Sequence, residues 1–589
     1  MHIALGKNVQ AVVGLVCMAF VAVQAHAGER LARGLIVQFK DAPAHQDAAP
    51  ATRGSGESEL ARVRRVLVAA GLSNARLRAV GRAAQRVDMG HLLGEREAAR
   101  LAARLRARPE VEWVVPNEIE QRLQVPNVPN DPRLVDGNQW WLKSVSGSDT
   151  NALADRLRGV PGFQTAWTFV KGSPTAVVAV LDTGITAHQD LDANVLPNSG
   201  YDFVSTVEYA KDGDGRDGDP SDEGDGVTRA DITNNPALFS LCKEENSSWH
   251  GTSTAGIVAA VTDNGKNIAA ASWNGRVLPV RVAGKCGAEV ADIIAGMRWA
   301  AGLHVDGVPD NPPAHWARVV NISFGGGAPC NKAYQDAIDE LSARGVVVVA
   351  AAGNEHVAPT RPANCNGVLG VTALNRDGFK ATYSNFGAKV AIATVGGDPT
   401  AVNVRKGDGI WGPFLGDSGI TTIGNSGVQD PGNAVERQRF GTSFSAPIVA
   451  GVVSLMFSAN PNLTTAQVIT GLRVTARPHV TSPEIGLCSN ANPGRCICTT
   501  STCGAGILDA AEAVRYAEDL RDGVVFMPVN WPTVVIDNGD VDAAVALGQD
   551  LPANVIPRTS SGGGALDLRW LLALALSVGG VAWVGRQRV

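Results

Sequence analysis

The chain has 589 residues, a length that allows several domains and a large core. Only 19% of the residues are charged, and the formal net charge of −5 argues against a nucleic acid or another polyanion as a partner. The 66 glycines favour a close-packed α/β enzyme over a helical or disordered protein.

Residues 1–27 have the three parts of an export signal. Lys7 gives a positive start, residues 11–23 form an apolar run, and Ala25-His26-Ala27 is an A-x-A cleavage site. The run is short for a membrane span, so we expect cleavage rather than anchoring. The sequence therefore predicts an exported protein that meets an export machinery.

One of the nine cysteines, Cys17, lies in this signal, which leaves eight. An even number in an exported chain indicates disulfides rather than free thiols. As one arrangement among several, we predict the pairs Cys242–Cys286 and Cys330–Cys365, with the last four pairing among themselves: Cys488, Cys496, Cys498 and Cys503. These four lie close enough together for zinc, but no histidine or CxxC pair accompanies them, which favours disulfides.

Residues 28–124 predict a small α+β domain. Residues 34–40 and 111–117 have the patterns of strands, and residues 95–108 form an arginine-rich helical pattern with Leu101 and Leu105 on one face. By itself, such a domain could be an independent binding module.

From residue 125 onward, strands and helices alternate. Continuous apolar runs are typical of parallel strands buried on both faces, and they occur at residues 177–181, 277–282, 318–323 and 346–351. Helical stretches lie between them at residues 251–261, 292–301 and 332–344. This order predicts a parallel sheet with helices on both faces. Polar residues at the carboxyl ends of such strands, here Asp182 and Asn354, face the crevice where ligands bind.

Four short motifs carry residues suited to nucleophilic catalysis. They are Asp182-Thr183-Gly184, His250-Gly251-Thr252, residues 351–354 (AAGN) and residues 441–447 (GTSFSAP). Each alone has an ordinary explanation as a turn or a helix cap. In the last motif, Ser443 would begin a helix, with Pro447 tolerated in its first turn. The order Asp, His, Ser is the order in subtilisin.

On these motifs, the chain resembles the subtilisin-like (subtilase) serine protease family over roughly residues 125–517. The resemblance implies a subtilisin-like α/β fold and a secreted bacterial enzyme that acts on protein or peptide substrates. It also implies that residues 28–124 are an inhibitory propeptide, because the Val-rich strand at 111–117 matches those of the family's propeptides. Cleavage would fall near residues 123–130, and the protein's own propeptide would be a partner.

The family's chemistry assigns a role to each catalytic residue. Ser443 is the nucleophile, His250 takes and returns its proton, and Asp182 holds the imidazole tautomer and stabilises the imidazolium. The side-chain amide of Asn354 and the backbone N–H of Ser443 would form the oxyanion hole.

By the same resemblance, two strand edges form the pocket for the residue before the cut: Ser323, Phe324, Gly325 and Gly326 on one side, and Ala351, Ala352 and Gly353 on the other. Small residues there allow a close approach of the substrate backbone and leave an open apolar slot. The alternative is that the glycines only end strands. Since these segments hold no acidic residue, we expect a broad preference for bulky apolar side chains.

One departure from the family follows His250. The family usually continues His-Gly-Thr with a second histidine and a valine, whereas Ser253 and Thr254 stand here. We expect this change to affect fine tuning rather than the triad.

An acidic, glycine-rich loop lies between Asp182 and His250. Closely spaced carboxylates are the ligands of a hard cation such as calcium, although the spacing is not that of an EF-hand. Because subtilases commonly carry calcium, we predict a structural calcium ion at Asp212, Asp214, Asp217, Asp219 and Asp222. A solvated acidic loop is the alternative.

The chain ends in a predicted spacer, residues 518–561, and a C-terminal segment, residues 562–589. In this segment a glycine run precedes apolar residues 570–584 and two arginines, a layout at the lower edge of what spans a bilayer. It resembles the Gly-Gly sorting signals of Gram-negative exported proteins, which an intramembrane protease removes. We therefore predict an extracellular or cell-surface protein of a Gram-negative-type bacterium, with a sorting machinery and transient membrane association. A buried helix is the alternative.

Two other functions compete with a secreted serine endopeptidase that acts through an acyl-enzyme. One is a catalytically silent subtilase-fold protein that binds peptides or proteins, and the complete set of catalytic positions argues against it. The other is an esterase, but the Gly-x-Ser-x-Gly elbow of that class is missing around Ser443.

Overall fold

The computed structural model describes residues 32–40, 59–73, 75–80, 84–90, 93–118, 128–145, 157–398, 403–405, 411–413, 419–482 and 486–536. The predicted export signal and the C-terminal sorting segment lie outside these residues. The chain forms two compact units, one of residues 1–128 with 515–532 and one of residues 129–514 with 533–589.

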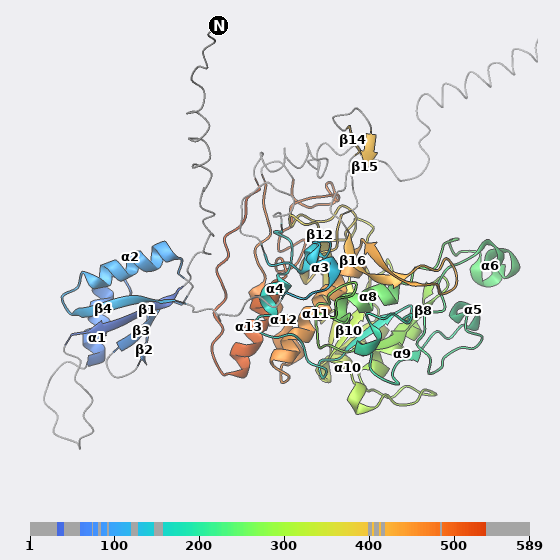
Figure 1. The fold of residues 1–589 in the computed structure, drawn as a ribbon, viewed down its shortest axis with the longest axis horizontal. Helices are drawn as coiled ribbons and strands as arrows, with labels where there is room; N and C mark the ends of the chain where they lie inside the picture. The colour runs from blue at the N-terminus through green and yellow to red at the C-terminus, as the bar shows by residue number, and fades with distance from the viewer. Residues whose placement is uncertain are drawn as a thin grey trace, which may run out of the picture. The chain divides into compact units, whose positions relative to one another are not determined.

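The first unit is a small α+β fold, as predicted (Figure 1). Its antiparallel sheet has the order β2-β3-β1-β4, formed by β1 (Ala32–Phe39), β2 (Arg76–Val80), β3 (Ala84–Asp88) and β4 (Val111–Glu118). Helices α1 (Glu59–Ala69) and α2 (Glu95–Arg106) complete it. The buried residues Leu101 and Leu105 of α2 pack in one cluster with Leu35 and Val37 of β1.

The second unit is built on a seven-stranded parallel sheet of order β13-β12-β11-β10-β5-β7-β6. The strands are β5 (Val178–Asp182), β6 (Tyr201–Asp202), β7 (Val277–Arg281), β10 (Val319–Ile322), β11 (Val347–Ala351), β12 (Val368–Leu374) and β13 (Ile392–Val395). After β5, the chain adds β7 and β6 on one side of β5 in the sheet, and it then adds β10 to β13 on the other side. Ligand crevices form where the strand order reverses in this way, at the carboxyl ends of β5 and β10.

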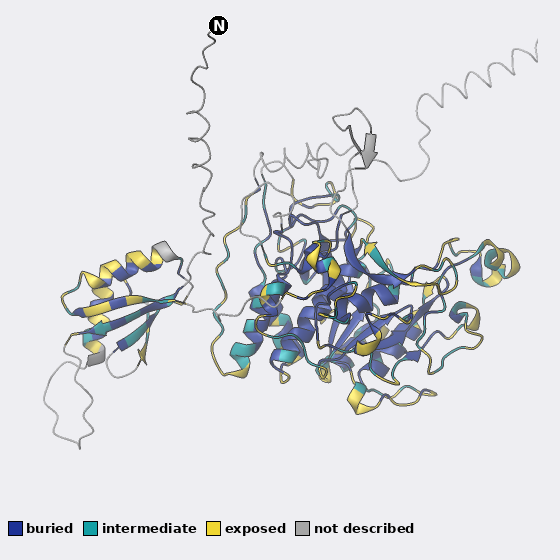
Figure 2. Cartoon of the chain, in the orientation of Figure 1, coloured by how far each residue is buried: buried dark blue, intermediate teal, exposed yellow. Residues whose placement is uncertain are grey.

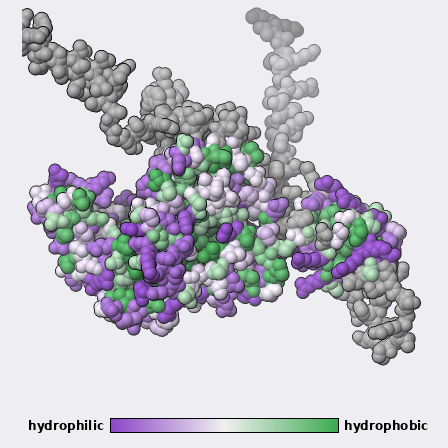
Figure 3. Space-filling view, turned by 180° about the vertical axis from the view of Figure 1, so that it is seen from behind, coloured by the Kyte–Doolittle hydropathy of each residue, from purple (hydrophilic) through white to green (hydrophobic). Residues whose placement is uncertain are grey.

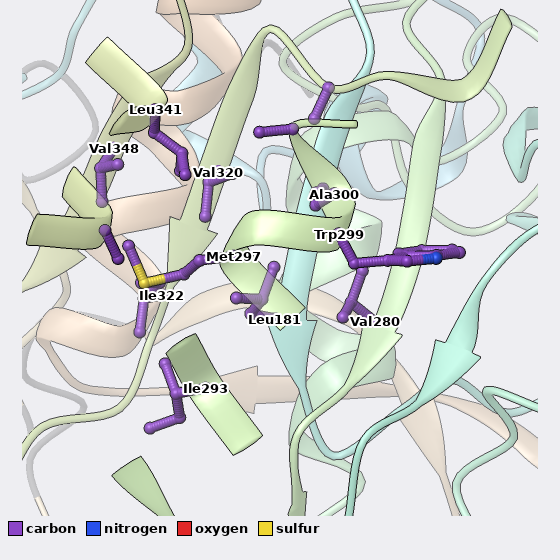
Figure 4. Packing of buried hydrophobic residues seen from close by; sticks show 14 of the residues in the cluster. Leu181, Val280, Ile293, Met297, Trp299, Ala300, Val320, Ile322, Leu341 and Val348 are labelled. Carbon is purple, nitrogen blue, oxygen red and sulfur yellow. The ribbon is translucent and has the colours of Figure 1, made fainter. Parts of the chain in front are cut away.

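Alternation along the strands decides which side chains meet which helices. Figure 4 shows Leu181, Val280 and Ile322 of the strands beside Met297 and Trp299 of α9 (Val290–Ala300). Helix α10 (Lys332–Ala343) also adds residues to this apolar cluster. Because successive strand side chains point to opposite faces, Asp182 points away from this cluster.

The opposite face of the sheet carries α8 (His250–Ala259) and α11 (Thr442–Ala459). Helix α8 packs on β5, α11 packs on β10 to β13, and the two helices contact each other. The strands between the helices are buried throughout (Figure 2). The fold therefore delivers one end of β5, α8 and α11 to the same place.

The remaining described elements are shorter or peripheral. They are α3 (Pro132–Val135), η1 (Trp140–Leu142), α4 (Phe163–Ala166), η3 (Asp192–Asn194), α5 (Val207–Ala210), α6 (Arg229–Asn234), α7 (Pro236–Phe239), β8 (Ala283–Gly284), β9 (Gly287–Ala288), η4 (Pro313–His315), β14 (Asn403–Arg405), β15 (Trp411–Pro413), β16 (Ile420–Asn425), β17 (Ala434–Arg439), α12 (Thr465–Thr475) and α13 (Ala510–Arg521). Of these, β17 matters most for the site, because it leads directly into α11.

The predicted disulfides are confirmed. Cys242 pairs with Cys286, Cys330 with Cys365, Cys488 with Cys496, and Cys498 with Cys503. All four lie in the second unit.

Within the described part of the chain, α11 alone is long and apolar enough to cross a membrane, and 89% of it is buried. It is therefore a core helix of the second unit. On the face drawn in Figure 3, hydrophobic residues are interspersed with hydrophilic ones. Single exposed apolar residues are ordinary on a globular protein and mark no site by themselves.

Candidate active site

Asp182 and His250 form a hydrogen-bonded pair at the carboxyl end of β5. Nδ1 of His250 lies 2.8 Å from Oδ1 and 3.0 Å from Oδ2 of Asp182. The carboxylate also accepts the backbone N–H of Thr183 at 2.9 Å and the hydroxyl of Thr254 at 3.1 Å. These donors hold a carboxylate that has no exposed surface.

A glycine allows the end of β5 and the start of α8 to approach so closely. A Cβ atom added to Gly251 would lie only 2.0 Å from the carbonyl oxygen of Gly184. Any other residue would push α8, and His250 with it, away from Asp182. This close approach is the physical reason for glycine directly after the histidine.

Burial and the neighbouring charge act in opposite directions on His250. Burial lowers the pKa of the imidazole, but the charge and the hydrogen bond of Asp182 raise it, and the net pKa is above the ordinary value. The positive charge of Arg439 works against this rise. The imidazole ring lies beside Phe324 and Phe444, with ring centroids at 5.5 and 5.2 Å.

Ser443 lies in the first turn of α11, after the N-cap Gly441, whose φ of 139° favours glycine. The expectation that Pro447 lies in this first turn is wrong, because the helix already begins at Thr442 and Pro447 falls in its second turn. Pro447 has no N–H to give to the carbonyl of Ser443 four residues earlier. The hydroxyl of Ser323 donates to that carbonyl instead, at 2.8 Å.

The hydroxyl of Ser443 donates to the carbonyl oxygen of Ser323 at 3.1 Å. Within the described residues, no hydrogen bond joins this hydroxyl to His250. Catalytic hydrogen bonds are often loose without substrate, and a rotation about one side-chain bond changes the acceptor of the hydroxyl. Of the three predicted triad residues, Asp182 and His250 are thus hydrogen-bonded to each other, and the Ser443 hydroxyl is turned toward Ser323, directly after β10.

The orientation of the Asn354 amide follows from its partners. Its Oδ1 accepts the backbone N–H and the hydroxyl of Thr442, both at 3.0 Å. A backbone N–H can only donate, so the oxygen must face Thr442, and the NH₂ group becomes the free donor end. The N–H of Ser443 lies in the first helical turn, where backbone donors have no intrahelical acceptor.

Each predicted pocket wall has one end close to Ser443 or its neighbour Thr442. One wall begins at Ser323, which is bonded to Ser443 in both directions. The other ends at Gly353, whose N–H donates to the hydroxyl of Thr442 at 3.0 Å. The remaining predicted wall residues are Phe324, Gly325 and Gly326, which follow Ser323, and Ala351 and Ala352, which precede Gly353.

The carboxylates of the acidic loop have separate partners and do not converge as the ligands of one metal ion would. Oδ2 of Asp212 lies 2.6 Å from Nη1 of Arg281, so this carboxylate is ion-paired. Asp222 is buried and accepts the hydroxyl of Thr183 at 2.5 Å and the N–H of Gly224 at 2.9 Å. Burial raises the pKa of Asp222 to about 7.

The other predicted ligands are Asp214, Asp217 and Asp219. The carboxylate of Asp219 accepts the N–H and the hydroxyl of Ser221, and that of Asp217 accepts the N–H of Asp219 at 2.8 Å. Among the described residues, no three histidine or acidic side chains gather with ligand atoms within 4.8 Å of one another. The five predicted carboxylates therefore do not fit one common calcium ion as they stand.

A second acidic site has the features that the loop lacks. Asp131 and Asp190 have no exposed surface, and burial, with a smaller contribution from the charge of Asp131, raises the pKa of Asp190 to about 7. Oδ1 of Asp131 is buried without a hydrogen-bond partner. Asp190 accepts the side-chain amide of Asn264 at 2.7 Å and the N–H of Ile268 at 3.0 Å. Among the described residues, no salt bridge joins a cationic side chain to either carboxylate, and only the charge of Lys266 acts to lower the pKa of Asp190.

Ser253 and Thr254, the departure noted in the sequence, both face the active-site machinery. Thr254 adds the hydroxyl donor to Asp182. The hydroxyl of Ser253 accepts a hydrogen bond from Nε of Arg439 at 3.3 Å, and Nη2 of Arg439 donates one to the carbonyl of Ser248 at 2.7 Å. Ser253 thus lies beside a guanidinium group that β17 contributes.

Comparison with known proteins agrees with this geometry. The family model of the Subtilase family matches residues 173–500, more than half of the chain. The chain belongs to the subtilase family. The resemblance and the subtilisin-like fold predicted from the motifs are thereby confirmed, and so is the enzyme class, a serine-type endopeptidase.

The chain is 39% identical over 453 residues to an extracellular protease of Xanthomonas campestris pv. campestris, covering 76% of this chain and 66% of the relative. It is 34% identical over 452 residues to an extracellular basic protease of Dichelobacter nodosus, covering 76% and 68%. A solved structure described as proteases from Pseudoalteromonas arctica PAMC 21717 matches with a TM-score of 0.54 and 39% identity, over 66% of this chain and 99% of that chain. The chain thus spans about two thirds of the length of the two named extracellular relatives.

Sequence reasoning missed several residues of the site. Thr254 and Arg439 touch the triad or its neighbours, and Asp131 and Asp190 form the buried carboxylate pair. The Ser-Thr departure was the available signal for Thr254. The other three carry no local motif, because their partners come from distant parts of the chain.

Proposed function

We propose that this subtilase is a secreted endopeptidase in which Asp182, His250 and Ser443 form the catalytic triad. The observation that carries the proposal is the contact of His250 Nδ1 with both oxygens of a buried Asp182, at 2.8 and 3.0 Å. This contact fixes the proton on Nδ1, so that Nε2 is the basic nitrogen. A protein that only bound peptides would not need this arrangement.

The reaction begins when the Ser443 hydroxyl turns from Ser323 to Nε2 of His250. His250 takes the proton as the oxygen attacks the peptide carbonyl, and Asp182 stabilises the resulting imidazolium without becoming protonated. The amide of Asn354 and the N–H of Ser443 donate to the oxyanion. His250 then protonates the leaving amine. In the second half of the reaction, His250 takes a proton from water as the water attacks the acyl group, and it returns this proton to the oxygen of Ser443.

The substrate is a protein or peptide held in extended form beside the walls at residues 323–326 and 351–353. Backbone groups at strand ends can pair with an extended chain, which supports an endopeptidase rather than an esterase. The extracellular relatives and the signal-like N-terminus support secretion.

The outer parts of the chain extend this proposal. We assign residues 28–124 as an inhibitory propeptide, residues 125–517 as the catalytic domain, and residues 562–589 as a sorting segment. The compact α+β unit before the catalytic domain and the Gly-rich, apolar C-terminus support these assignments. The propeptide would be removed by the enzyme itself.

For calcium, we propose Asp131 and Asp190 as ligands in place of the acidic loop. Subtilases commonly bind calcium, and a divalent ion would neutralise two carboxylates that otherwise repel each other in a buried place. The orphaned Oδ1 of Asp131 supports this choice. The ion would add stability and takes no part in the reaction.

The test combines active-site labelling with mass spectrometry. A peptidyl diphenyl phosphonate should label wild-type protein at Ser443, and Ser443→Ala should show no labelling, no peptide hydrolysis and a retained propeptide. Intact mass of the secreted wild type gives both processed ends. Absence of labelling in correctly folded wild type would support the silent binding protein, and normal maturation of Ser443→Ala in a protease-deficient host would exclude self-processing.

A further inference from the structure

Trp249, the residue directly before the proposed base His250, has a backbone conformation that a large side chain rarely adopts. It is the N-cap of α8, and its φ of 52° and ψ of 37° lie in the left-handed region. Glycine adopts this conformation freely, but for a bulky residue it is an unfavourable outlier. Such a conformation persists only where the surrounding structure holds it, and it often marks a functional site.

The indole ring of Trp249 provides one of the contacts that hold it. The residue is 1% exposed, and its Nε1 donates to the carbonyl of Gly427 at 2.8 Å. Gly427 lies in the turn between β16 and β17. In this turn, Oδ1 of the buried Asn425 accepts the N–H groups of Gly427 and Gly432, at 2.9 and 2.6 Å. The acceptor of the indole N–H is thus itself fixed by a side chain.

The two residues before this tryptophan are held by contacts of the same kind. The N–H and the hydroxyl of Ser247 donate to the carbonyls of residues 428–429 in the same turn, both at 2.8 Å. The N–H and the hydroxyl of Ser248 donate to the two carboxylate oxygens of Asp225, both at 2.6 Å. Three successive residues are therefore anchored to distant segments before the chain reaches His250.

The β16–β17 hairpin also leads to the nucleophile. Helix α8 packs against β16 (Figure 1), and β17 ends at Arg439, shortly before α11 begins at Thr442. One hairpin thus contacts the start of the helix that carries His250 and continues into the helix that carries Ser443. Since a base must lie within hydrogen-bond reach of the proton it takes, a shift of either helix start would impair the transfer.

We propose that Trp249 is a positioning residue, whose indole N–H anchors the start of α8 to the β16–β17 turn and so holds the His250 imidazole within reach of Ser443. Trp249 acts through His250 and takes no proton itself. The inference rests on the proposed endopeptidase function and adds a residue that sets its rate.

The test replaces Trp249 with phenylalanine, which keeps an aromatic ring but removes the N–H. Trp249→Phe should lower kcat for a chromogenic peptide anilide by about 10- to 100-fold, because a misplacement of about 1 Å costs about 10²-fold. KM should stay nearly unchanged, since the lost contact does not bind substrate. The matched control is Trp299→Phe in α9. Trp299 is also buried, and its Nε1 donates to the carbonyl of Pro309 at 2.8 Å, so this variant should lose stability but keep its kcat.

A second variant tests the connection from the side of the turn. Asn425→Ala removes the acceptor that fixes the turn and leaves Trp249 in place. It should lower kcat with KM nearly unchanged, and it serves if Trp249→Phe does not fold. Combining the two changes should add little further loss, because both break the same connection.

Three results would overturn the inference: an unchanged kcat in Trp249→Phe, an equal loss of kcat in Trp299→Phe, or fully additive losses in the double variant. Failure of the endopeptidase proposal looks different. In that case wild type cleaves no anilide and the phosphonate does not label Ser443, whereas an active wild type with an equally active Trp249→Phe contradicts only the role of Trp249.

Discussion

Asp182 and Asp190 are eight residues apart, and both carboxylates are fully buried. Asp182 meets the imidazole of His250 and two further donors. Asp190 accepts the amide of Asn264, and its pKa is raised to about 7 by burial and, to a smaller extent, by the charge of Asp131. The same residue type at the same burial thus serves two different sites.

The difference shows that the partner, rather than the burial, decides what a buried carboxylate does. A carboxylate beside a group that can accept a proton stabilises that group's cation. A carboxylate beside another carboxylate is unfavourable unless a proton or a metal ion joins them. The two aspartates can therefore be separated by experiment, one through catalysis and the other through stability.

The largest expected effect is on Asp182. Asp182→Asn should lower kcat by about 10⁴, because an asparagine selects the wrong imidazole tautomer while preserving the shape. The rate is measured with a peptide substrate, and the melting temperature shows that the fold is intact. Asp214→Asn, a change in the exposed acidic loop, is the control and should leave kcat unchanged. A loss of less than tenfold in Asp182→Asn would remove Asp182 from the triad.

The second effect concerns the oxyanion hole. Asn354→Ala should lower kcat by about 10²- to 10³-fold with little change in KM, since the lost hydrogen bond forms only with the oxyanion. Thr442→Val removes the hydroxyl that orients the amide but keeps the backbone donor, so it should cost less. Equal losses in the two variants would mean that Asn354 acts through Thr442 and not on the substrate.

The third effect separates the buried pair from the acidic loop. At a calcium concentration of a hundred times the dissociation constant, binding to the folded state adds about 2.7 kcal/mol, and the melting temperature rises accordingly. Asp131→Asn with Asp190→Asn should abolish the difference between calcium and chelator. The matched pair Asp214→Asn with Asp219→Asn should keep it. The reverse outcome would return the calcium site to the loop.

The smallest effect is on the pH profile. His250 must be neutral to accept a proton, so kcat/KM rises with pH through the pKa of His250, which Asp182 holds above the usual value of about 6.5. Arg439 lowers this pKa by charge repulsion, and Arg439→Gln should therefore move the acid limb to higher pH. Arg437→Gln, two residues earlier on β17, should move it less. A shift to lower pH would contradict the electrostatic account.

Much of this site was predictable because its residues sit at topologically determined places. Asp182 ends a strand and His250 begins a helix on the face opposite the α9 cluster, so the alternation of side chains brings them together. The apolar runs at residues 177–181 and 346–351 were enough to find the strands. The predicted walls and their small residues also follow from strand ends.

The rest depended on contacts between distant segments. Thr360 is attached to Ala352 by two hydrogen bonds, and nothing in its local sequence indicates this contact. In the acidic loop, charge density alone likewise does not show that Asp212 is ion-paired with Arg281 and that Asp222 accepts the hydroxyl of Thr183. The local sequence shows which charged and polar side chains are present, whereas their hydrogen-bond and ion-pair partners are set by the tertiary packing.

The disulfides divide the protein into two parts that respond differently to the redox state of their surroundings. Residues 28–124 contain no cysteine, and all four crosslinks lie in the catalytic unit. Closing loops with sequence separations of 44 and 35 residues stabilises by about 4 kcal/mol each in the chain-entropy account. A reducing cytoplasm withholds this stabilisation from the protease but not from the unit that precedes it. The catalytic unit thus gains its full rigidity only where thiols oxidise.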